Sequence, residues 1–557
     1  MELDYQHIVF DYVKSSDHAA KTPAHHPVIV VGAGPVGLTV AIDLAQQGVP
    51  VVVLDDDDKL SVGSRAICFA KRTLEIFDRL QCGDRFADKG ISWNVGKVFF
   101  HDEPVYSFNL LPEAGHHRPA FVNLQQYYAE GYLLERARQL ANLDIRWKHK
   151  VIGLSQLGDG VELTVETPDG TCRLRADYAV AADGSRSPVR AMMGLESKGQ
   201  VFKDRFLIAD VRMKAEFPTE RWFWFDPPFH PNQSVLLHRQ PDNVWRIDFQ
   251  LGWDADPAVE KSPERVIPRI RALLGQDAEF DLEWVSVYTF SCLRMEKFRH
   301  GRVLFVGDAA HLVSPFGARG ANSGVQDADN LAWKLKLVLA GEAPTTLLDS
   351  YASEREYAAD ENLRNSTRST DFITPKSRIS RIFRDAVLKL AKDQPFARKL
   401  VNSGRLSMPS TYVGSLLNTP DEDVFTGAMM PGAPAADAPV ATDGQASWFL
   451  THVGNGFAGI YFSDGTPLSG DTLAALQSLA TGKLPIKPIV VVPHGTRMTG
   501  VAGIVFLEDK DGLLAQRFDG RAGTYYLLRP DQHVCARWRA LDIDKARAAM
   551  ARAIGKQ

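Results

Sequence analysis

The chain has 557 residues, of which 45% are hydrophobic and 24% charged, and its formal net charge is −4. This composition is typical of soluble globular proteins, and it argues against global disorder, a fibrous repeat and a nucleic-acid partner. At roughly 150 residues per domain, the length predicts about three or four domains. Five scattered cysteines without a C-x-x-C pair predict neither a disulfide framework nor a metal site.

The first 27 residues are rich in charged and polar side chains and lack the apolar core of a signal peptide. The longest nearly apolar stretch starts at Val28 and meets Asp43, which is too short for a membrane span. We therefore expect a cytoplasmic protein with no membrane partner.

Residues 28–57 predict a β-α-β unit, because a β-branched run, a glycine-rich turn, a helical stretch and a second β-branched run follow one another. Gly32, Gly34 and Gly37 form G-x-G-x-x-G between the first strand and the helix. In a dinucleotide site these glycines allow the tight turn, the approach of the pyrophosphate and the helix–strand packing. Asp55 ends the second strand, where an acid accepts a hydrogen bond from the adenosine ribose. The alternative is a tight turn without a ligand.

Further segments follow in chain order. A helix is expected within 121–140, strands over 151–165 and 171–182, and an antiparallel hairpin from 234–239 and 244–251 around the turn QPDN. The aromatic-rich region 205–290 then forms a sheet separate from the parallel one. A buried strand at 303–308 precedes helices at about 321–340 and from about Thr346, and a Pro- and Ala-rich linker near residue 430 leads to a small α/β domain.

Two more motifs complete a pattern. AADGSRSPVR contains Asp183 and Gly184, and GDAAHLVSPFGARGANSG begins at Gly307 and Asp308. In this order and spacing, the three motifs resemble those of the class A flavoprotein monooxygenases, the single-component FAD-dependent aromatic hydroxylases. The resemblance is strong over about residues 26–360 and weaker over 425–557. Larger members of this family, such as phenol hydroxylase and 3-(3-hydroxyphenyl)propionate hydroxylase, add a thioredoxin-like domain.

The resemblance implies an α/β fold: a 4-hydroxybenzoate-hydroxylase-like FAD-binding Rossmann domain, an antiparallel-sheet substrate domain and a C-terminal thioredoxin-like domain. The expected boundaries are 1–200 and 285–345 for the FAD-binding domain, 201–284 for the substrate-binding sheet, 346–424 for a helical segment and 425–557 for the thioredoxin-like domain. Without C-x-x-C, that last domain is not expected to exchange disulfides.

The resemblance also implies the residues that bind FAD. They are Gly32, Gly34, Gly37, Asp55, Arg65, Gln126, Asp183, Gly307, Asp308, Gly320, Ala321 and Asn322. Gln125 adjoins Gln126 and could take its role. Asp183 is implied to shape both the FAD site and NAD(P)H access. The amides of Gly320 to Asn322 head a long helix, whose positive end would favour the charge on reduced flavin.

The catalytic candidates are Pro315, His238 and Asp248. In the family, the carbonyl of the proline that matches Pro315 faces the substrate. On the predicted hairpin, Arg246 and Asp248 share one face, and they either contact substrate or form a surface ion pair.

We therefore expect NAD(P)H- and dioxygen-dependent hydroxylation of a phenolic compound through a flavin hydroperoxide, by a protein that forms a homodimer. One alternative is a flavin-dependent halogenase, because WFWFDP at 222–227 is similar to a halogenase W-x-W-x-I-P motif. Another is a non-catalytic binding protein on the related dissociation-inhibitor fold.

Overall fold

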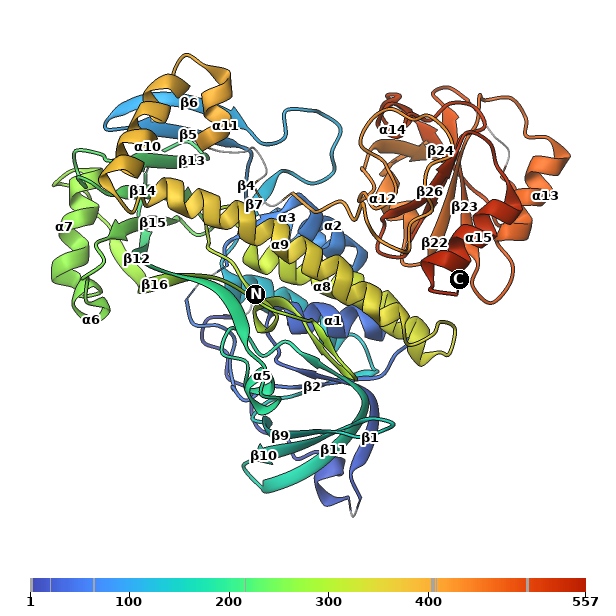
Figure 1. Ribbon diagram of the computed structural model, residues 1–557, viewed down its shortest axis with the longest axis horizontal. Coiled ribbons are helices and arrows are strands. Elements are labelled where there is room, and N and C mark those ends of the chain that lie inside the picture. The colour runs from blue at the N-terminus through green and yellow to red at the C-terminus, as the bar shows by residue number, and fades with distance from the viewer. Residues whose placement is uncertain are drawn as a thin grey trace.

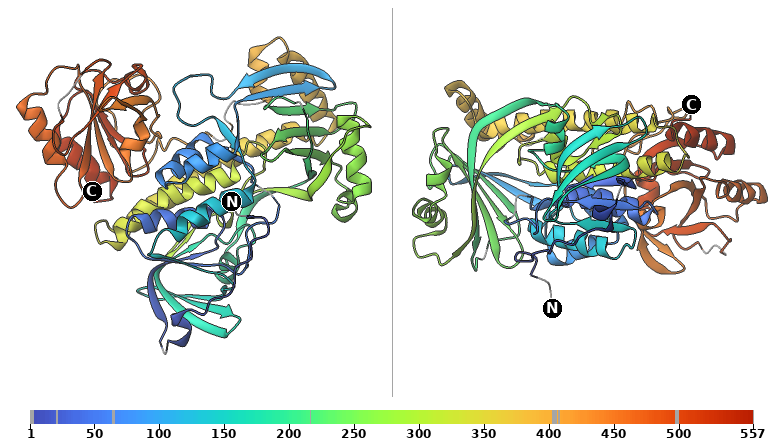
Figure 2. Two further views of the ribbon diagram at one scale, coloured as in Figure 1. Left: turned by 180° about the vertical axis from the view of Figure 1, so that it is seen from behind. Right: turned by 90° about the horizontal axis from the view of Figure 1, so that it is seen from below.

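A computed structural model describes residues 4–20, 22–63, 66–215, 217–401, 406, 408–496 and 500–556. Figure 1 shows three parts: a sheet-and-helix body around α1, a second sheet beside it, and a C-terminal domain on the opposite side, with the long helices α8 and α9 running between them. Two further views show the same arrangement (Figure 2). In the described ranges, no helix is both long and apolar enough to cross a membrane, and no group of three or more metal-binding side chains could hold a metal ion.

The first sheet is built on the predicted β-α-β unit. Its path runs β17-β18-β11-β1-β2-β8, with β10 and β9 continuing from β11, and β18, β11, β1, β2 and β8 are parallel. The β-branched residues of β1 and β2 are fully buried between helices, which is why they form central strands. The strands are β1 (Ala24–Val31), β2 (Val51–Leu54), β8 (Leu143–Arg146), β9 (Lys150–Gln156), β10 (Val161–Thr167), β11 (Gly170–Ala181), β17 (Arg299–His300) and β18 (Val303–Phe305).

Helices cover this sheet, and α1 packs on both α4 and α8. The helices of this part are η1 (Ser16–Ala19), α1 (Pro35–Gln46), α2 (Lys71–Arg79), α3 (Gly83–Lys89), α4 (Gln126–Arg138), α5 (Pro188–Met192), η2 (Gly307–Ala309) and α8 (Gly320–Leu339). A small sheet pairs β3 (Cys68–Ala70), β7 (Phe121–Asn123) and β4 (Ile91–Trp93). The helix expected within 121–140 therefore begins only at Gln126, after a short strand.

The second sheet has the order β19-β16-β12-β15-β14-β13-β5-β6, and all of its pairs are antiparallel except β13 with β5. Its hairpin, β14 and β15, has the predicted bounds. The sheet extends beyond residues 201–284, because β5 and β6 come from far earlier in the chain. Its strands are β5 (Val95–Phe100), β6 (Glu103–Asn109), β12 (Ser197–Arg212), β13 (Arg221–Phe225), β14 (Ser234–Arg239), β15 (Val244–Leu251), β16 (Asp281–Met295) and β19 (His311–Leu312).

Helices lie on both sides of this sheet. Val266 and Ile270 of α7 join the apolar cluster on one face, whereas Leu388 of α10 joins the cluster on the other. The helices are α6 (Pro257–Glu260), α7 (Pro263–Leu274), α9 (Leu347–Ile373), α10 (Arg378–Ala391) and α11 (Pro395–Val401).

The C-terminal domain contains a mixed sheet of order β21-β20-β24-β23-β22-β25-β26, in which β22, β23 and β24 are parallel and β25 and β26 antiparallel. This topology agrees with the predicted thioredoxin-like domain. Its elements are β20 (Pro439–Thr442), β21 (Gln445–Trp448), α12 (Phe449–Val453), β22 (Phe457–Phe462), α13 (Gly470–Leu479), β23 (Ile486–Pro493), β24 (Val505–Asp509), α14 (Leu513–Phe518), β25 (Tyr525–Leu528), β26 (Val534–Trp538) and α15 (Ile543–Ala553).

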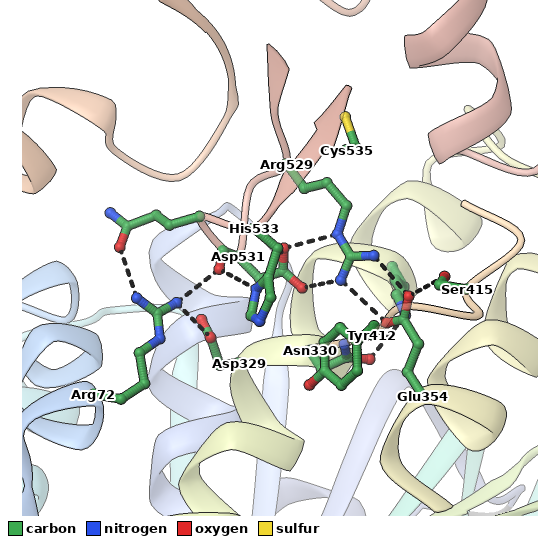
Figure 3. Close-up of polar contacts among 12 residues, drawn as sticks. Arg72, Asp329, Asn330, Glu354, Tyr412, Ser415, Arg529, Asp531, His533 and Cys535 are labelled. Carbon is green, nitrogen blue, oxygen red and sulfur yellow. Dashed lines mark hydrogen bonds and ion pairs between the residues drawn. The ribbon is translucent and has the colours of Figure 1, made fainter. Parts of the chain in front are cut away.

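Buried charges join this domain to the first part (Figure 3). Arg529, before β26, donates to both carboxylate oxygens of Glu354 on α9, at 2.7 and 3.1 Å, and to Asp531. Lys334 of α8 donates to the same Glu354 at 2.8 Å. Arg72 of α2 donates to the Asp531 carbonyl at 2.7 Å. Burial costs these charges their hydration, so they are stable only while the two parts stay together.

Candidate active site

One cavity of about 370 Å³ lies where the first and second sheets meet. The loops that follow β1, β11 and β18 line it, as do residues of β12 to β16. Because these three strands are parallel, their carboxyl ends meet at one edge, the usual ligand-binding edge of an open α/β sheet. The three sequence motifs therefore come together at a single cavity.

The three glycines of the first motif differ in their surroundings. Gly32 has φ +107°, and a Cβ there would lie 2.5 Å from the carbonyl oxygen of Ala182. A Cβ on Gly37 would collide with the carbonyl oxygen of Gly32, whereas one on Gly34 would meet nothing within 4 Å. Gly34 lines the cavity and immediately precedes α1, so open space adjoins the positive end of that helix.

Asp55 stabilises this glycine loop through hydrogen bonds to backbone amides. Its Oδ2 accepts a hydrogen bond from the Ala33 amide at 2.5 Å, and its Oδ1 accepts one from the Asp57 amide at 2.9 Å. Burial raises the pKa of this carboxyl. Asp55 is not among the described residues that line this cavity.

A polar group on α4 faces the cavity. Gln126 accepts from the Ala66 amide at 3.0 Å and donates to Ser61 at 2.9 Å and to Glu130 at 2.8 Å. Glu130 also accepts from the amide and hydroxyl of Ser61, and burial raises its pKa. Gln126, Glu130 and Ser61 all line the cavity, whereas Gln125 donates to Pro241 in the direction of the second sheet. Sequence reasoning missed Glu130, although its position four residues after Gln126 puts both on one helix face.

Arg65 lies outside the described residues, so its predicted role stays a prediction.

The second and third motifs supply two acids. Asp183 accepts from the Val189 amide at 2.9 Å through Oδ2, and burial raises its pKa. Its Oδ1 is buried and has no hydrogen-bond partner within the described ranges. Asp308 is exposed and lines the cavity. Gly307, at φ +58°, donates its amide to Asp327 of α8 at 2.9 Å, which fixes the turn that presents Asp308.

The first turn of α8 completes this side of the cavity. Gly320, Ala321 and Asn322 all line it. The Asn322 side chain accepts from the Ala70 amide at 2.8 Å and donates to the Cys68 carbonyl at 2.8 Å, which ties the helix start to β3. Pro315 is exposed to the cavity, and its carbonyl accepts from the Ala318 amide at 3.0 Å in a turn.

A row of polar residues crosses the second sheet. Asp210 and Arg246 are register partners on β12 and β15, and Arg246 pairs in turn with His238 on β14. Arg246 donates through Nε and Nη2 to the two carboxylate oxygens of Asp210, each at 2.8 Å. Arg246 and Asp248 both line the cavity, as their shared strand face predicts. The surface ion-pair interpretation of these two residues is wrong, because Arg246 is buried and pairs with Asp210.

Three polar atoms at this side have no hydrogen-bond partner among the described residues: Nη1 of Arg221, Nδ1 of His238 and Oδ1 of Asp248. His238 Nε2 lies 3.7 Å from Asp248 Oδ2. Burial raises the pKa of Asp248 to about 6. Burial and the charges of Arg221 and Arg246 hold the pKa of His238 well below its usual range, so His238 is neutral at neutral pH. Sequence reasoning missed Arg221, which no motif contains.

The family described as FAD binding domain matches residues 25–366. The chain belongs to this FAD-binding family. It is 27% identical over 527 residues to a 3-(3-hydroxy-phenyl)propionate/3-hydroxycinnamic acid hydroxylase of Mycolicibacterium smegmatis, covering 92% of this chain and 90% of that protein. It is 32% identical over 350 residues to a flavin-dependent monooxygenase of Mycobacteroides abscessus, covering 59% of this chain and 70% of that one.

Solved structures of flavin-dependent monooxygenases have a fold similar to that of this chain. The flavin-dependent monooxygenase PieE, in complex with FAD and substrate, superposes with a TM-score of 0.80 at 22% identity, over 96% of this chain and all of that one. Aklavinone-11 hydroxylase, in complex with FAD and aklavinone, gives 0.77 at 24% identity, over 96% and 99%. These likenesses confirm the predicted fold, and together with the family and the relatives they identify an FAD-dependent aromatic hydroxylase.

The residues of this hydroxylase fit the cofactor. Open space at Gly34 and the starts of α1 and α8 adjoin the cavity, and Asp183, whose buried Oδ1 has no partner among the described residues, stands in the chain between the lining residues Ala182 and Gly184. These are a close-approach point for a pyrophosphate, an acceptor for a hydroxyl or an amine, and two positive helix ends.

The aromatic motif at 222–227 lies in β13 and the turn after it. Trp222 and Trp224 pack in the cluster with Trp245 and Phe249, on the face opposite to Arg221. The motif therefore forms core rather than cavity wall, and the hydroxylase assignment fits better than the halogenase or a non-catalytic binding protein.

Proposed function

We propose that this hydroxylase acts on a phenolic compound that carries an acidic group, with NAD(P)H and dioxygen as co-substrates. A ring C–H becomes C–OH, NAD(P)H provides a hydride and a proton is taken up, and the second oxygen atom leaves as water. One observation carries the proposal: the unpartnered atoms of Arg221, His238 and Asp248 share a single cavity with the dinucleotide-binding loops.

Arg221 is the reason to expect an acidic group on the substrate. The residue is 9% exposed, and Nη1 has no partner in the described parts of the chain. A buried cation is stable when a hydrogen-bonded anion accompanies it, and a carboxylate matches the planar guanidinium. The relatives whose names include 3-(3-hydroxy-phenyl)propionate act on such a phenolic acid, which agrees with this assignment.

Asp248 and His238 are the residues proposed to accept the proton of the phenol. A carboxylate with a pKa near 6 is ionised at neutral pH and can accept the phenolic proton, directly or through neutral His238. Loss of that proton raises the electron density of the ring, which favours attack by an electrophilic oxygen. Pro315, whose carbonyl the family resemblance directs at the substrate, would orient the same hydroxyl.

The FAD-binding roles are proposed residue by residue. Gly32, Gly34 and Gly37 would admit the pyrophosphate, Asp55 and Asp308 would bind sugar hydroxyls, and Arg65, Gln126 and Asp183 would flank the cofactor. Gly307 shapes the turn before Asp308, and the amides of Gly320, Ala321 and Asn322 would stabilise negative charge on the ring. FAD, when bound, supplies the redox chemistry with dioxygen. Apolar residues such as Phe206, Leu236 and Phe290 line the cavity and exclude water from it.

The test is a panel of phenols with and without a carboxylate side chain, measured by NAD(P)H oxidation, product identification and ¹⁸O₂ labelling. We expect phenolic acids to accelerate NAD(P)H oxidation and to gain one labelled hydroxyl. If no phenol accelerates oxidation above the basal rate, or if the new oxygen comes from water, the proposal fails. A homodimer and a cytoplasmic location stay predictions.

A further inference from the structure

A second cavity of about 780 Å³ lies beneath α9, α10 and α11, against β12 and β16. It adjoins the first cavity: on β16, Phe290 lines the first and Cys292, two residues on and so on the same face, lines the second. A hydrogen bond of 2.8 Å from Thr370 of α9 to Ser314, next to Pro315, joins this helix to the loop that lines the first cavity. A ligand in the second cavity would therefore lie beside the flavin-side loop without occupying the substrate space.

Positive charge is in excess in this cavity. Arg364 and Arg368 are four residues apart on α9, so they lie side by side on one helix face, and in the described ranges neither forms an ion pair. Arg384 of α10 is 1% exposed, and its Nε donates to Asp385 at 2.9 Å. Its Nη2, 2.8 Å from the same carboxylate, makes no hydrogen bond to any part of the chain that the structure describes. Among the lining residues that the structure describes, Asp371 is the one carboxylate.

Aromatic side chains form the remaining wall. Phe372 and Phe383 line the cavity, and Phe383 is 56% exposed. A large exposed ring beside unpaired arginines suits a ligand with both a flat aromatic ring and several negative charges.

We propose that this cavity binds NAD(P)H through its phosphates, with Arg364, Arg368 and Arg384 as their partners and Phe372 and Phe383 beside the adenine. The inference rests on the proposed function, which requires such a reductant. A volume of about 780 Å³ is more than a single phenol fills. Three cations match a pyrophosphate and, in NADPH, the 2′-phosphate.

Another G-x-G-x-x-G spacing does not offer an alternative site. Gly454 and Gly456 lie between α12 and β22 and Gly459 lies within β22, so this segment leads into a strand and lacks the helix N-terminus that binds a pyrophosphate. The arginine-lined cavity is therefore the better candidate for the second dinucleotide.

The test is the double variant Arg364→Glu/Arg368→Glu in the FAD-loaded enzyme, with NADP⁺ and NAD⁺ binding measured by calorimetric titration. We expect the Kd for NADP⁺ and the apparent KM for NADPH each to rise on the order of tenfold or more, because two charge-assisted contacts are lost. The matched control is Arg265→Glu/Arg271→Glu on α7, which makes the same change in net charge on the other side of the sheet. A loss of affinity no larger than in this control would overturn the inference.

A second measurement separates this inference from the proposed function. When the flavin is photoreduced without nucleotide and then exposed to dioxygen and a phenol, the α9 double variant should form as much product as the wild type. A variant that also loses product here would show damage to the catalytic cavity and overturn the inference. A wild type that NAD(P)H cannot reduce would instead overturn the proposed function. If the double variant loses less affinity for NAD⁺ than for NADP⁺, these arginines bind the 2′-phosphate. If the two losses are equal, they bind the pyrophosphate.

Discussion

Arg246 on β15 and Asp210 on β12 lie opposite each other, and two hydrogen bonds of 2.8 Å join their side chains. The pair is buried, so each charge compensates the other within the sheet. Of Arg221 and Arg246 at this end of the cavity, Arg221 is the one with a buried donor that has no partner among the described residues. This division of roles predicts which arginine selects the substrate.

Arg221→Met should raise the KM for a phenolic acid by roughly 10- to 100-fold, since a charge-assisted hydrogen bond contributes about 1.5–3 kcal/mol. A phenol without an acidic group should keep its KM within a few-fold. Steady-state kinetics on the two substrates measures the difference, and FAD content controls for folding. Equal losses on both substrates would contradict a role in recognising the acid.

Asp248 should govern the acid limb of the pH profile. Because its pKa is raised to about 6, kcat/KM should fall as the pH drops through 6, where the carboxylate becomes protonated. Asp248→Asn should lower activity and remove this limb. An unchanged limb near pH 6 in the variant would assign the proton transfer to another group.

Asp248→Asn should also change the free energy of unfolding, in a direction that follows from the raised pKa. The folded protein holds this proton more tightly than an unfolded chain with the ordinary pKa of 3.8, so the stability contribution present below about pH 4 is lost as the pH rises to 6. At pH 8, Asp248→Asn should therefore unfold at a higher temperature than the wild type. Its free energy of unfolding should be larger by on the order of 2–3 kcal/mol. At pH 4 the two should differ little. Calorimetry at both pH values tests this.

Two alanine substitutions in the glycine loop should separate cofactor binding from folding. Gly34→Ala meets no protein atom within 4 Å, so the apoprotein should keep its melting temperature but lose FAD, because the methyl group enters the pyrophosphate space. Gly37→Ala collides with the Gly32 carbonyl and should destabilise the apoprotein itself. Flavin absorbance and thermal unfolding of the two apoproteins distinguish these effects. Full FAD retention in Gly34→Ala would place the pyrophosphate elsewhere.

Asp308→Ala should weaken FAD retention, because the exposed carboxylate that lines the cavity is the expected partner of a sugar hydroxyl. Loss of one hydrogen bond to a charged group predicts roughly a 10- to 100-fold higher Kd. Fluorescence titration of the apoprotein with FAD measures it, and wild-type-like affinity would reject this role. Asp360→Ala, on the outer side of α9, is a matched control.

Arg529→Met should destabilise the protein by about 3–5 kcal/mol, since Glu354 and Asp531 would stay buried without their shared cation. The exposed Arg521, 3.5 Å from Asp519, provides a control, and Arg521→Met should change stability by less than about 1 kcal/mol. Differential scanning calorimetry compares the two. Equal effects would show that the interdomain charges contribute little.

The sequence predicted local elements well and long-range pairing poorly. The bounds of β14 and β15 were predictable because alternating apolar residues flank a turn-forming Pro-Asp-Asn. The pairing of β13 with β5 was not, since nothing local selects a strand so far away in the chain. Likewise, the dinucleotide loops were predictable from glycine spacing, whereas Arg221 acquires its role only when strands align its side chain with His238. The partner of Arg246 was equally hidden, because Asp210 belongs to another strand.

The buried charges between Arg529 and Glu354 also bear on how this enzyme can be engineered. Cutting the chain near residue 425 would remove Arg529 and open the Glu354 carboxylate of α9 to solvent, with Lys334 as its remaining cation beside the donors Asn330 and Ser415. A shortened enzyme would therefore need redesign of α8 and α9 before it could stay monodisperse. Swapping the C-terminal domain among relatives should succeed only when the donor brings an arginine to the same place.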